Sequence, residues 1–421
     1  MSKISRRSFV GLAAASSAAL SMPSIAFGVG PRVVVIGGGA GGATAAKYIA
    51  KDSKGAINVT LVEASKRYYT CFFSNLYLGG VRNYGSIGHN YYGLAVNHGV
   101  NVVHEWAGSV DTASKKVNLG SGATVSYDKL VLSPGIDLNY DSINGYSAEA
   151  QTHMPHAWKS GTQVQLLKNQ VLNMKQGGTF VMVTPPNPYR CPPGPYERIS
   201  MIAHQFKKTN PTAKIVVLDP KMKFSKMGLF MDGWQKHYPG MIEWIDPETH
   251  GGLKNINVAK MEFETDLDTF KADAASVVPA QRAGAIAMAA GVNDGDWCPI
   301  NPASMQSKAD ENIYVLGDAS VAASMPKSGF SANSQAKVAA NHIRGSLTGS
   351  KVFDARYANT CWSLVGTNDG IKVGASYKAG PEKIDATSKF VSKTGEDSAV
   401  RKATYDESVS WYDGITTDMF S

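Results

Sequence analysis

The chain has 421 residues, 43% of them hydrophobic, with 42 glycines and 4 cysteines. This apolar fraction fills a core and the length suits two or three domains, so wholesale disorder is excluded. Four cysteines are too few for a disulfide scaffold. The formal charge is +8, but Lys and Arg are scattered without a dense basic run, so we expect no nucleic-acid partner.

Residues 1–28 are typical of an export signal. SRRSFV from Ser5 is a twin-arginine motif, a short Ala-rich apolar stretch follows, and small residues near position 26 suit cleavage. A membrane anchor is the alternative, which the shortness of the apolar stretch disfavours. We therefore expect a folded, cofactor-loaded protein in the periplasm, where disulfides persist, with no membrane insertion after the signal is cleaved.

The mature chain opens with the pattern of a dinucleotide site. A β-branched strand over 32–36 leads into GGGAGG and a helix over 43–50, so Gly37, Gly39 and Gly42 match G-x-G-x-x-G between strand and helix. The first glycine permits a tight turn, the second lets the backbone approach a pyrophosphate, and the third lets helix and strand pack closely. The alternative is a Gly-rich turn in another kind of α/β protein.

Two acidic residues extend this prediction. A second strand over 57–62 ends at Glu63, where a carboxylate accepts hydrogen bonds from a ribose diol. A later strand over 312–316 ends in Gly317-Asp318, and in two-dinucleotide flavoproteins such an Asp binds the ribityl chain of FAD. The alternative for Asp318 is a helix cap or turn. Together these features predict an FAD domain built from both ends of the chain.

A second nucleotide domain is predicted without its phosphate loop. The strand over 178–183 is followed by the Pro-rich segment 184–195, which contains Cys191, and then by a helix over 196–206 and a strand over 213–218. Proline has no N–H to donate, so this loop cannot cradle a pyrophosphate in the usual way. We therefore expect that electrons do not come from or go to NAD(P)H.

The cysteines fall in distinct contexts. Cys191 lies where nicotinamide would otherwise bind, and Cys361 lies in the C-terminal section. Cys71 lies in a segment that passes beside the isoalloxazine in this architecture, whereas Cys298 is interpreted as a small buried hydrophobe. Four cysteines allow three pairings if all are oxidised, or one pair plus free thiols, and the residues alone leave this open.

At these positions the chain resembles the flavoprotein subunit of flavocytochrome c sulfide dehydrogenase, over essentially the whole mature chain. The supporting segments are VVVIGGGAGGATAAKYI from Val33, YYTCFFSN from Tyr68, YRCPPGPYERIS from Tyr189, VVPAQRAG from Val277, MPKSGFSANSQAKVAA from Met325 and SWYDGITTDMF from Ser410. The second and third segments are quite specific, while the Gly motif is not.

The resemblance implies several roles. Cys71 would hold FAD covalently through a thioether to its 8α-methyl group, and Cys191 and Cys361 would form a redox-active disulfide near the flavin. The substrate would be a small inorganic sulfur compound, and a c-type cytochrome subunit would take the electrons. This chain has no C-x-x-C-H motif, so the haem must be on the partner. No metal site is predicted within the chain itself.

The implied fold class is α/β, a glutathione-reductase-like flavoprotein with two dinucleotide-binding domains. The expected divisions are the signal peptide, 1–28; a Rossmann-like FAD domain, 29–155 and 297–345; a second Rossmann-like substrate and disulfide domain, 156–296; and a C-terminal interface domain, 346–421.

Further candidates carry open alternatives. Glu197 is a candidate for handling the proton of H2S, or else a first-turn Glu that interacts with the helix dipole. Lys327 precedes a predicted helix over 331–343, and either adds charge near the flavin or belongs to an ordinary capped helix. Arg190 and Arg198 either attract an anion or are solvated, and both stay unassigned.

The predicted function is periplasmic oxidation of sulfide to zero-valent sulfur or polysulfide through the disulfide and FAD. The alternatives are an exported flavoprotein acting on a sulfur carrier in thiosulfate oxidation, a sulfide:quinone reductase, and a non-enzymatic subunit with a vestigial flavin fold. The export signal and the polar tail 406–421 disfavour the quinone reductase. The cysteine pair disfavours the vestigial subunit.

Overall fold

A computed structural model describes residues 29–421, so the predicted export signal at 1–28 lies outside the described residues. The first domain is built on a five-stranded parallel sheet of order β20-β9-β1-β2-β5. Its strands are β1 (Arg32–Ile36), β2 (Asn58–Val62), β5 (Asn101–Val103), β9 (Lys129–Leu132) and β20 (Ile313–Val315). Because β20 pairs with β9, both ends of the chain build this sheet, as predicted.

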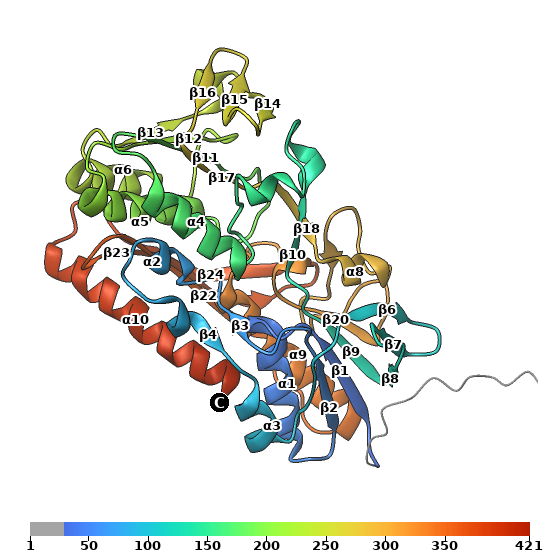
Figure 1. Cartoon of the computed structure of the whole chain (residues 1–421). Coiled ribbons are helices and arrows are strands. Elements are labelled where there is room, and N and C mark those ends of the chain that lie inside the picture. Colours follow the sequence, from blue (N-terminus) through green and yellow to red (C-terminus); the bar gives the residue numbers. More distant parts are fainter. Residues whose placement is uncertain (1–28) are drawn as a thin grey trace, which may run out of the picture.

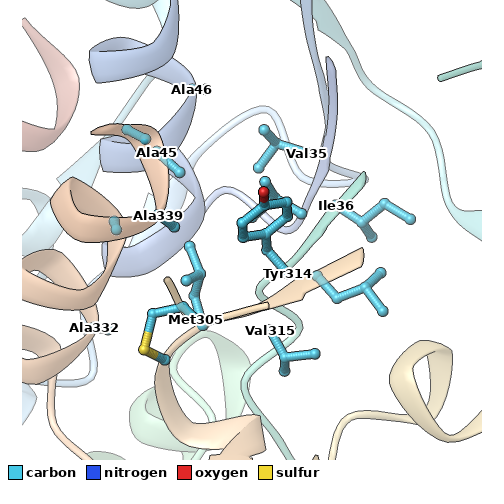
Figure 2. Packing of buried hydrophobic residues seen from close by; sticks show 14 of the residues in the cluster. Val35, Ile36, Ala45, Ala46, Met305, Tyr314, Val315, Ala332 and Ala339 are labelled. Atoms are coloured by element: carbon cyan, nitrogen blue, oxygen red, sulfur yellow. The ribbon is translucent and has the colours of Figure 1, made fainter. Parts of the chain in front are cut away.

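Two helices, α1 (Ala40–Ser53) and α9 (Gly329–Thr348), pack against each other and against this sheet. Figure 2 shows Val35 and Tyr314 from the strands facing Ala45 and Ala339 from the helices. All four are fully buried. Small alanines let the two helices approach closely, and β-branched residues fill the face of the sheet.

The second domain contains a parallel sheet of order β13-β12-β11-β17. Its strands are β11 (Thr179–Val183), β12 (Lys214–Leu218), β13 (Ile242–Ile245) and β17 (Ala274–Val277), and its helices are α4 (Thr162–Asn173), α5 (Gly194–Thr209) and α6 (Met227–His237). Residues 184–193 connect β11 to α5 and carry Cys191, at the position of the missing phosphate loop. Two antiparallel strands, β10 (Ile136–Asn139) and β18 (Ala280–Ala283), lie between the two sheets (Figure 1).

The C-terminal section is an antiparallel sheet of β22 (Arg356–Gly366), β23 (Asp369–Ala379) and β24 (Ile384–Val391), followed by α10 (Ser398–Phe420). Figure 1 shows α10 running along the outside of the molecule, from the region of β23 to that of α1 and α3 (Tyr92–His98). The polar tail is therefore the end of a 23-residue helix that packs on the protein. In residues 29–421 no helix is both long and apolar enough to cross a membrane.

The remaining elements are short. They are β3 (Tyr68–Tyr69), α2 (Ser74–Leu78), β4 (Gly88–His89), β6 (Ala107–Asp111), β7 (Lys116–Leu119), β8 (Thr124–Ser126), α7 (Pro247–His250), β14 (Leu253–Asn257), β15 (Glu262–Thr265), β16 (Thr269–Lys271), α8 (Ala285–Ala289), β19 (Cys298–Pro299) and β21 (Ser320–Val321). Cys298, in β19, is completely buried and belongs to the hydrophobic core. This agrees with its interpretation as a small buried hydrophobe.

Candidate active site

The glycine loop between β1 and α1 brings strand and helix into very close contact. Gly37 has a φ of +96°, which favours glycine, and a Cβ on Gly42 would lie 1.8 Å from the carbonyl oxygen of Gly37. Gly39 precedes α1, and no side chain caps that helix. The backbone N–H of Gly38 donates to Glu63 Oε2 at 2.8 Å, so the carboxylate lies directly beside the loop.

Gly37, Gly38 and Gly39 line a cavity of about 710 Å³, which we call the dinucleotide cavity. Glu63, Gly317 and Asp318 line it, and so does Gly329 at the start of α9. Asp318 Oδ1 is buried and has no hydrogen-bond partner within the described residues, while its Oδ2 lies 3.6 Å from Arg190 Nη1. An unpaired buried oxygen is costly, so a hydroxyl donor on a bound group fits here. The open glycine cradle and this oxygen fit a dinucleotide such as FAD.

A second cavity, of about 80 Å³, adjoins the first and is called the inner cavity. Cys71, Cys191, Cys361 and Glu197 all line it, and Cys71 also lines the dinucleotide cavity. The three thiols are free in the structure. The fold thus brings together three cysteines that are far apart in sequence, although their predicted disulfide and flavin bonds stay predictions.

Cys191 is held in an uncommon backbone conformation, with a φ of +58°. Its N–H donates to the carbonyl oxygen of Lys327 at 2.7 Å, and the N–H of Gly194 donates to the Cys191 carbonyl at 2.7 Å. Burial raises the pKa of the Cys191 thiol well above its ordinary value, and the neighbouring Cys361 and Glu197 raise it further. A disulfide between two such buried sulfurs avoids the cost of burying a thiolate.

Cys361 lies on β22 beside two groups that favour an anion. Asn359 Nδ2 donates to Cys361 Sγ at 3.4 Å, and Lys226 Nζ donates to the Cys361 carbonyl at 2.9 Å. Burial raises the pKa of the Cys361 thiol, while the Asn359 hydrogen bond and the Lys226 ammonium oppose that rise. Burial also lowers the pKa of Lys226 to about 8. Lys226 was not predicted as a site residue, because it lies 135 residues from Cys361 in the chain.

Glu197, on α5, connects three elements at the inner cavity. Its Oε2 accepts from Asn75 Nδ2 of α2 at 2.8 Å, and its Oε1 accepts from the N–H of Leu364 in β22 at 3.0 Å. Burial raises the pKa of the carboxyl group in spite of these hydrogen bonds. The side chain therefore faces the cysteines, although Glu197 also lies in the first turn of α5.

Two predicted site residues, Gly42 and Lys327, line neither cavity, and Lys327 directs its side chain elsewhere. Its Nζ donates to the carbonyl oxygens of Asp318 and Ser320 at 2.7 and 2.9 Å and lies 3.6 Å from the centre of the Trp297 ring. The start of α9 itself does reach the cavities, and Ser328 caps it through its hydroxyl, which accepts from the N–H of Ser331. This matches the ordinary capped helix, because the lysine is occupied elsewhere.

The two arginines left unassigned are not solvated. Arg198 is 2% exposed and donates to the carbonyl oxygens of His156 and Ala157 at 2.7 and 2.6 Å, so it fixes a buried loop. Arg190 lines both cavities beside Asp318. No local pattern could assign either residue, because their partners are distant in sequence. Trp411 of α10 also lines the inner cavity, with its ring centre 5.0 Å from that of Trp362.

Comparison with known families agrees with this geometry. Residues 164–279 match the family described as sulfide dehydrogenase (flavocytochrome c) flavoprotein chain, central. Residues 353–420 match flavocytochrome c sulphide dehydrogenase, flavin-binding, and residues 31–178 match pyridine nucleotide-disulphide oxidoreductase. The predicted α/β fold with two Rossmann-like domains is therefore confirmed.

Individual relatives point the same way. The chain is 57% identical over 44 residues to the sulfide dehydrogenase (flavocytochrome c) flavoprotein chain of Chlorobaculum thiosulfatiphilum, which is 10% of this chain and 90% of that sequence. It is also 22% identical to the mitochondrial sulfide:quinone oxidoreductase of Mus musculus over 299 residues. This alignment covers 68% of this chain and 65% of the length of that protein.

Solved structures show the same fold. The sulfide:quinone oxidoreductase of the hyperthermophilic bacterium Aquifex aeolicus superposes with a TM-score of 0.68 at 18% identity, covering 92% of each chain. The putidaredoxin reductase–putidaredoxin complex gives a TM-score of 0.66 at 14% identity, covering 89% of this chain and 93% of the other.

Proposed function

Because this chain belongs to the flavocytochrome c sulfide dehydrogenase flavoprotein family, we propose that it oxidises sulfide to zero-valent sulfur or polysulfide and passes the electrons to a separate c-type cytochrome. The observation that carries this proposal is the inner cavity. It gathers Cys71, Cys191, Cys361 and Glu197 against a second cavity that fits FAD.

The sulfur chemistry follows from these side chains. Hydrosulfide attacks the Cys191–Cys361 disulfide, so one S–S bond forms as another breaks, which leaves a persulfide on one cysteine and a thiolate on the other. Glu197 holds the proton released when H2S becomes hydrosulfide, and its raised pKa suits that task. Lys226 and Asn359 stabilise negative charge at Cys361. FAD, when bound, supplies a two-electron acceptor that can return electrons singly to a haem.

Three finer features complete the proposal. Cys71 holds the flavin covalently, which is consistent with its place between the two cavities. The haem is on the partner, because this chain has no C-x-x-C-H motif. The twin-arginine motif at residues 5–10 directs the protein to the periplasm.

The test is to express the full chain with its signal in its own host, isolate the periplasmic fraction, and purify the protein under mild conditions. We expect a c-type subunit, visible by haem staining, to co-purify, and sulfide to bleach the flavin absorbance before the haem is reduced. Co-purification of a sulfur-carrier protein without haem would instead support the thiosulfate alternative. A flavin that sulfide does not reduce would contradict sulfide oxidation.

A further inference from the structure

A third cavity, of about 260 Å³, also reaches Cys361, and we call it the outer pocket. It is lined by residues of four segments: Pro192 and Pro193, Ser225, Ser324 and Pro326, and the β22–β24 residues Asn359, Cys361, Val373, Gly374, Ala375, Tyr377 and Lys389. Ser324 and Lys389 are exposed, whereas Asn359 is 3% exposed, so the pocket runs from the surface to the buried cysteine.

The outer pocket and the inner cavity share Cys361 and are otherwise lined by different residues. Cys361 lines both of them, Cys191 lines only the inner cavity, and the next two residues, Pro192 and Pro193, line only the outer pocket. The strand register explains the floor of the pocket. Asn359 is paired with Ala375 and Cys361 with Val373, so these four side chains share one face of the β22–β23 sheet. Cys361 is thus the one residue that lines both spaces within the described residues.

The lining suits a small sulfur anion. At the floor, Ser328 Oγ donates to Asn359 Oδ1 at 2.5 Å, which orients the amide so that its Nδ2 donates to Cys361 Sγ. At the mouth, Lys389 contributes an ammonium group that forms no ion pair within residues 29–421. No Asp or Glu lines the pocket, and its walls include three prolines, Val373 and Ala375. A cationic mouth, apolar walls and an amide donor beside the sulfur favour a soft anion over a hydrated one.

We propose that the outer pocket is the route by which hydrosulfide reaches Cys361 Sγ and by which the sulfur product leaves it. This inference rests on the proposed function and adds the side of attack. Hydrosulfide arriving through this pocket forms a bond to Cys361 Sγ and breaks the Cys191–Cys361 bond. The electron pair of the broken bond goes to Cys191 Sγ, which lines the inner cavity and takes up the proton of the hydrosulfide. The ionised persulfide left on Cys361 faces the outer pocket, and Asn359 and Lys226 stabilise its negative charge.

The first test obstructs the mouth. Ser324→Trp places a bulky ring at an exposed position on the rim, and Ser388→Trp places the same ring at an exposed position on β24 that does not line the pocket. In stopped-flow experiments on the FAD-loaded protein, we expect Ser324→Trp to slow flavin reduction by sulfide about tenfold or more, with Ser388→Trp like the wild type. Reduction by dithionite should be equal in all three proteins.

An unchanged sulfide rate in Ser324→Trp, with a reducible wild type, would overturn the outer route and leave sulfide oxidation standing. A wild type that sulfide cannot reduce would refute the proposed function and this inference with it.

The second test changes charge alone and does not depend on how the first variant folds. Lys389→Glu should lower the second-order rate constant for sulfide about fivefold at low salt, because it reverses the charge at the mouth. The difference should vanish near 1 M salt, where the screening length falls to about 3 Å. Lys393→Glu, an exposed lysine that does not line the pocket, is the matched control. Equal rate constants for the two variants at low salt would overturn the proposal.

Discussion

At the scale of single residues, the proposed bond between Cys71 and the flavin can be tested directly. Its place between the two cavities predicts that denaturing the wild type in acid leaves the flavin on the protein. Cys71→Ser should release all of its flavin in the same treatment, because it lacks the sulfur of the proposed thioether. Cys298→Ser, which changes a buried core thiol, should retain the flavin. Absorbance of the acid supernatant at the flavin wavelengths measures both, and free flavin from the wild type would refute the covalent bond.

Glu197 predicts a pH dependence. Burial raises the pKa of this carboxyl group, so it is protonated, and unable to accept the substrate's proton, up to a higher pH than an ordinary glutamate. The rate of flavin reduction by sulfide should rise as pH passes through that raised pKa. Glu197→Gln should lower the rate about 100-fold and remove this rise, since an amide accepts no proton.

The control for this prediction is Glu248→Gln, which changes a first-turn glutamate of α7 that is exposed. It should keep the rate and the pH profile of the wild type. If Glu197→Gln kept the wild-type pH profile, Glu197 would be a residue of the helix dipole alone, as in the alternative given for it.

Residue positions in the site were predictable where a local motif carries them. The glycine loop, Glu63 and the positions of Cys71 and Cys191 could be read from neighbouring residues, because strand, turn and helix are local. Lys226 and Arg190 could not, since each acts on a partner more than 100 residues away. Lys327 is a different case. Its sequence position beside α9 was correct, but the direction of its side chain depends on Trp297 and the turn after Asp318.

At the scale of elements, the contact between β1 and α1 is a sensitive one. A Cβ on Gly42 would lie 1.8 Å from the Gly37 carbonyl oxygen, so backbone must move to admit it. We expect Gly42→Ala to lower the free energy of unfolding by about 3 kcal/mol and to weaken flavin retention during folding. Urea unfolding of the flavin-free and flavin-loaded proteins measures the two effects separately.

The matched substitution is Gly414→Ala, in the middle of α10, where nothing lies within 4 Å of the added Cβ. It should raise the free energy of unfolding by about 0.5–1 kcal/mol, because alanine loses less backbone entropy in a helix. If both variants destabilised the protein equally, close packing at Gly42 would not be the reason for that glycine.

The bounds of the strands were predicted more accurately than the ends of the helices. The strands over 32–36, 57–62 and 178–183 have the buried β-branched pattern of parallel sheets, and the structure confirms them to within one residue. The helix predicted over 43–50 extends to Ala40–Ser53, since packing on α9 outweighs the low helix propensity of two glycines. Helix α10 was harder to predict, because four of its eight buried residues are polar and the buried face therefore gives no apolar stripe.

At the scale of the whole molecule, α10 holds the C-terminal sheet to the FAD domain. Near its start, Arg401 Nε donates to the buried Asp369 of β23 at 2.5 Å. Near its end, Asp418 accepts from Tyr48 of α1 at 2.7 Å and from Asn333 of α9 at 2.8 Å. Lys337 Nζ lies 2.8 Å from the same carboxylate. One carboxylate therefore ties three helices together.

Asp418 gives the contact between α10, α1 and α9 a defined pH dependence. Burial alone would raise the pKa of this carboxyl group, but hydrogen bonds from Lys337, Asn333 and Tyr48 outweigh it and lower the pKa below its ordinary value of 3.8. A lowered folded-state pKa contributes stability above the unfolded-state pKa, and that contribution is lost as pH falls through the folded value. Asp418→Asn should therefore lower the free energy of unfolding by about 2 kcal/mol at pH 7 and by progressively less below pH 4.

The comparison variant is Asp406→Asn on the same helix, whose carboxylate pairs with Lys402 at 2.6 Å in an exposed i,i+4 contact. An exposed pair of this kind contributes at most about 0.5 kcal/mol, so its loss should be small at every pH. Urea unfolding of both variants between pH 3 and pH 7 separates the two cases. If Asp418→Asn lowered the free energy of unfolding by the same amount at every pH in that range, packing would hold α10 in place and the charge of Asp418 would not.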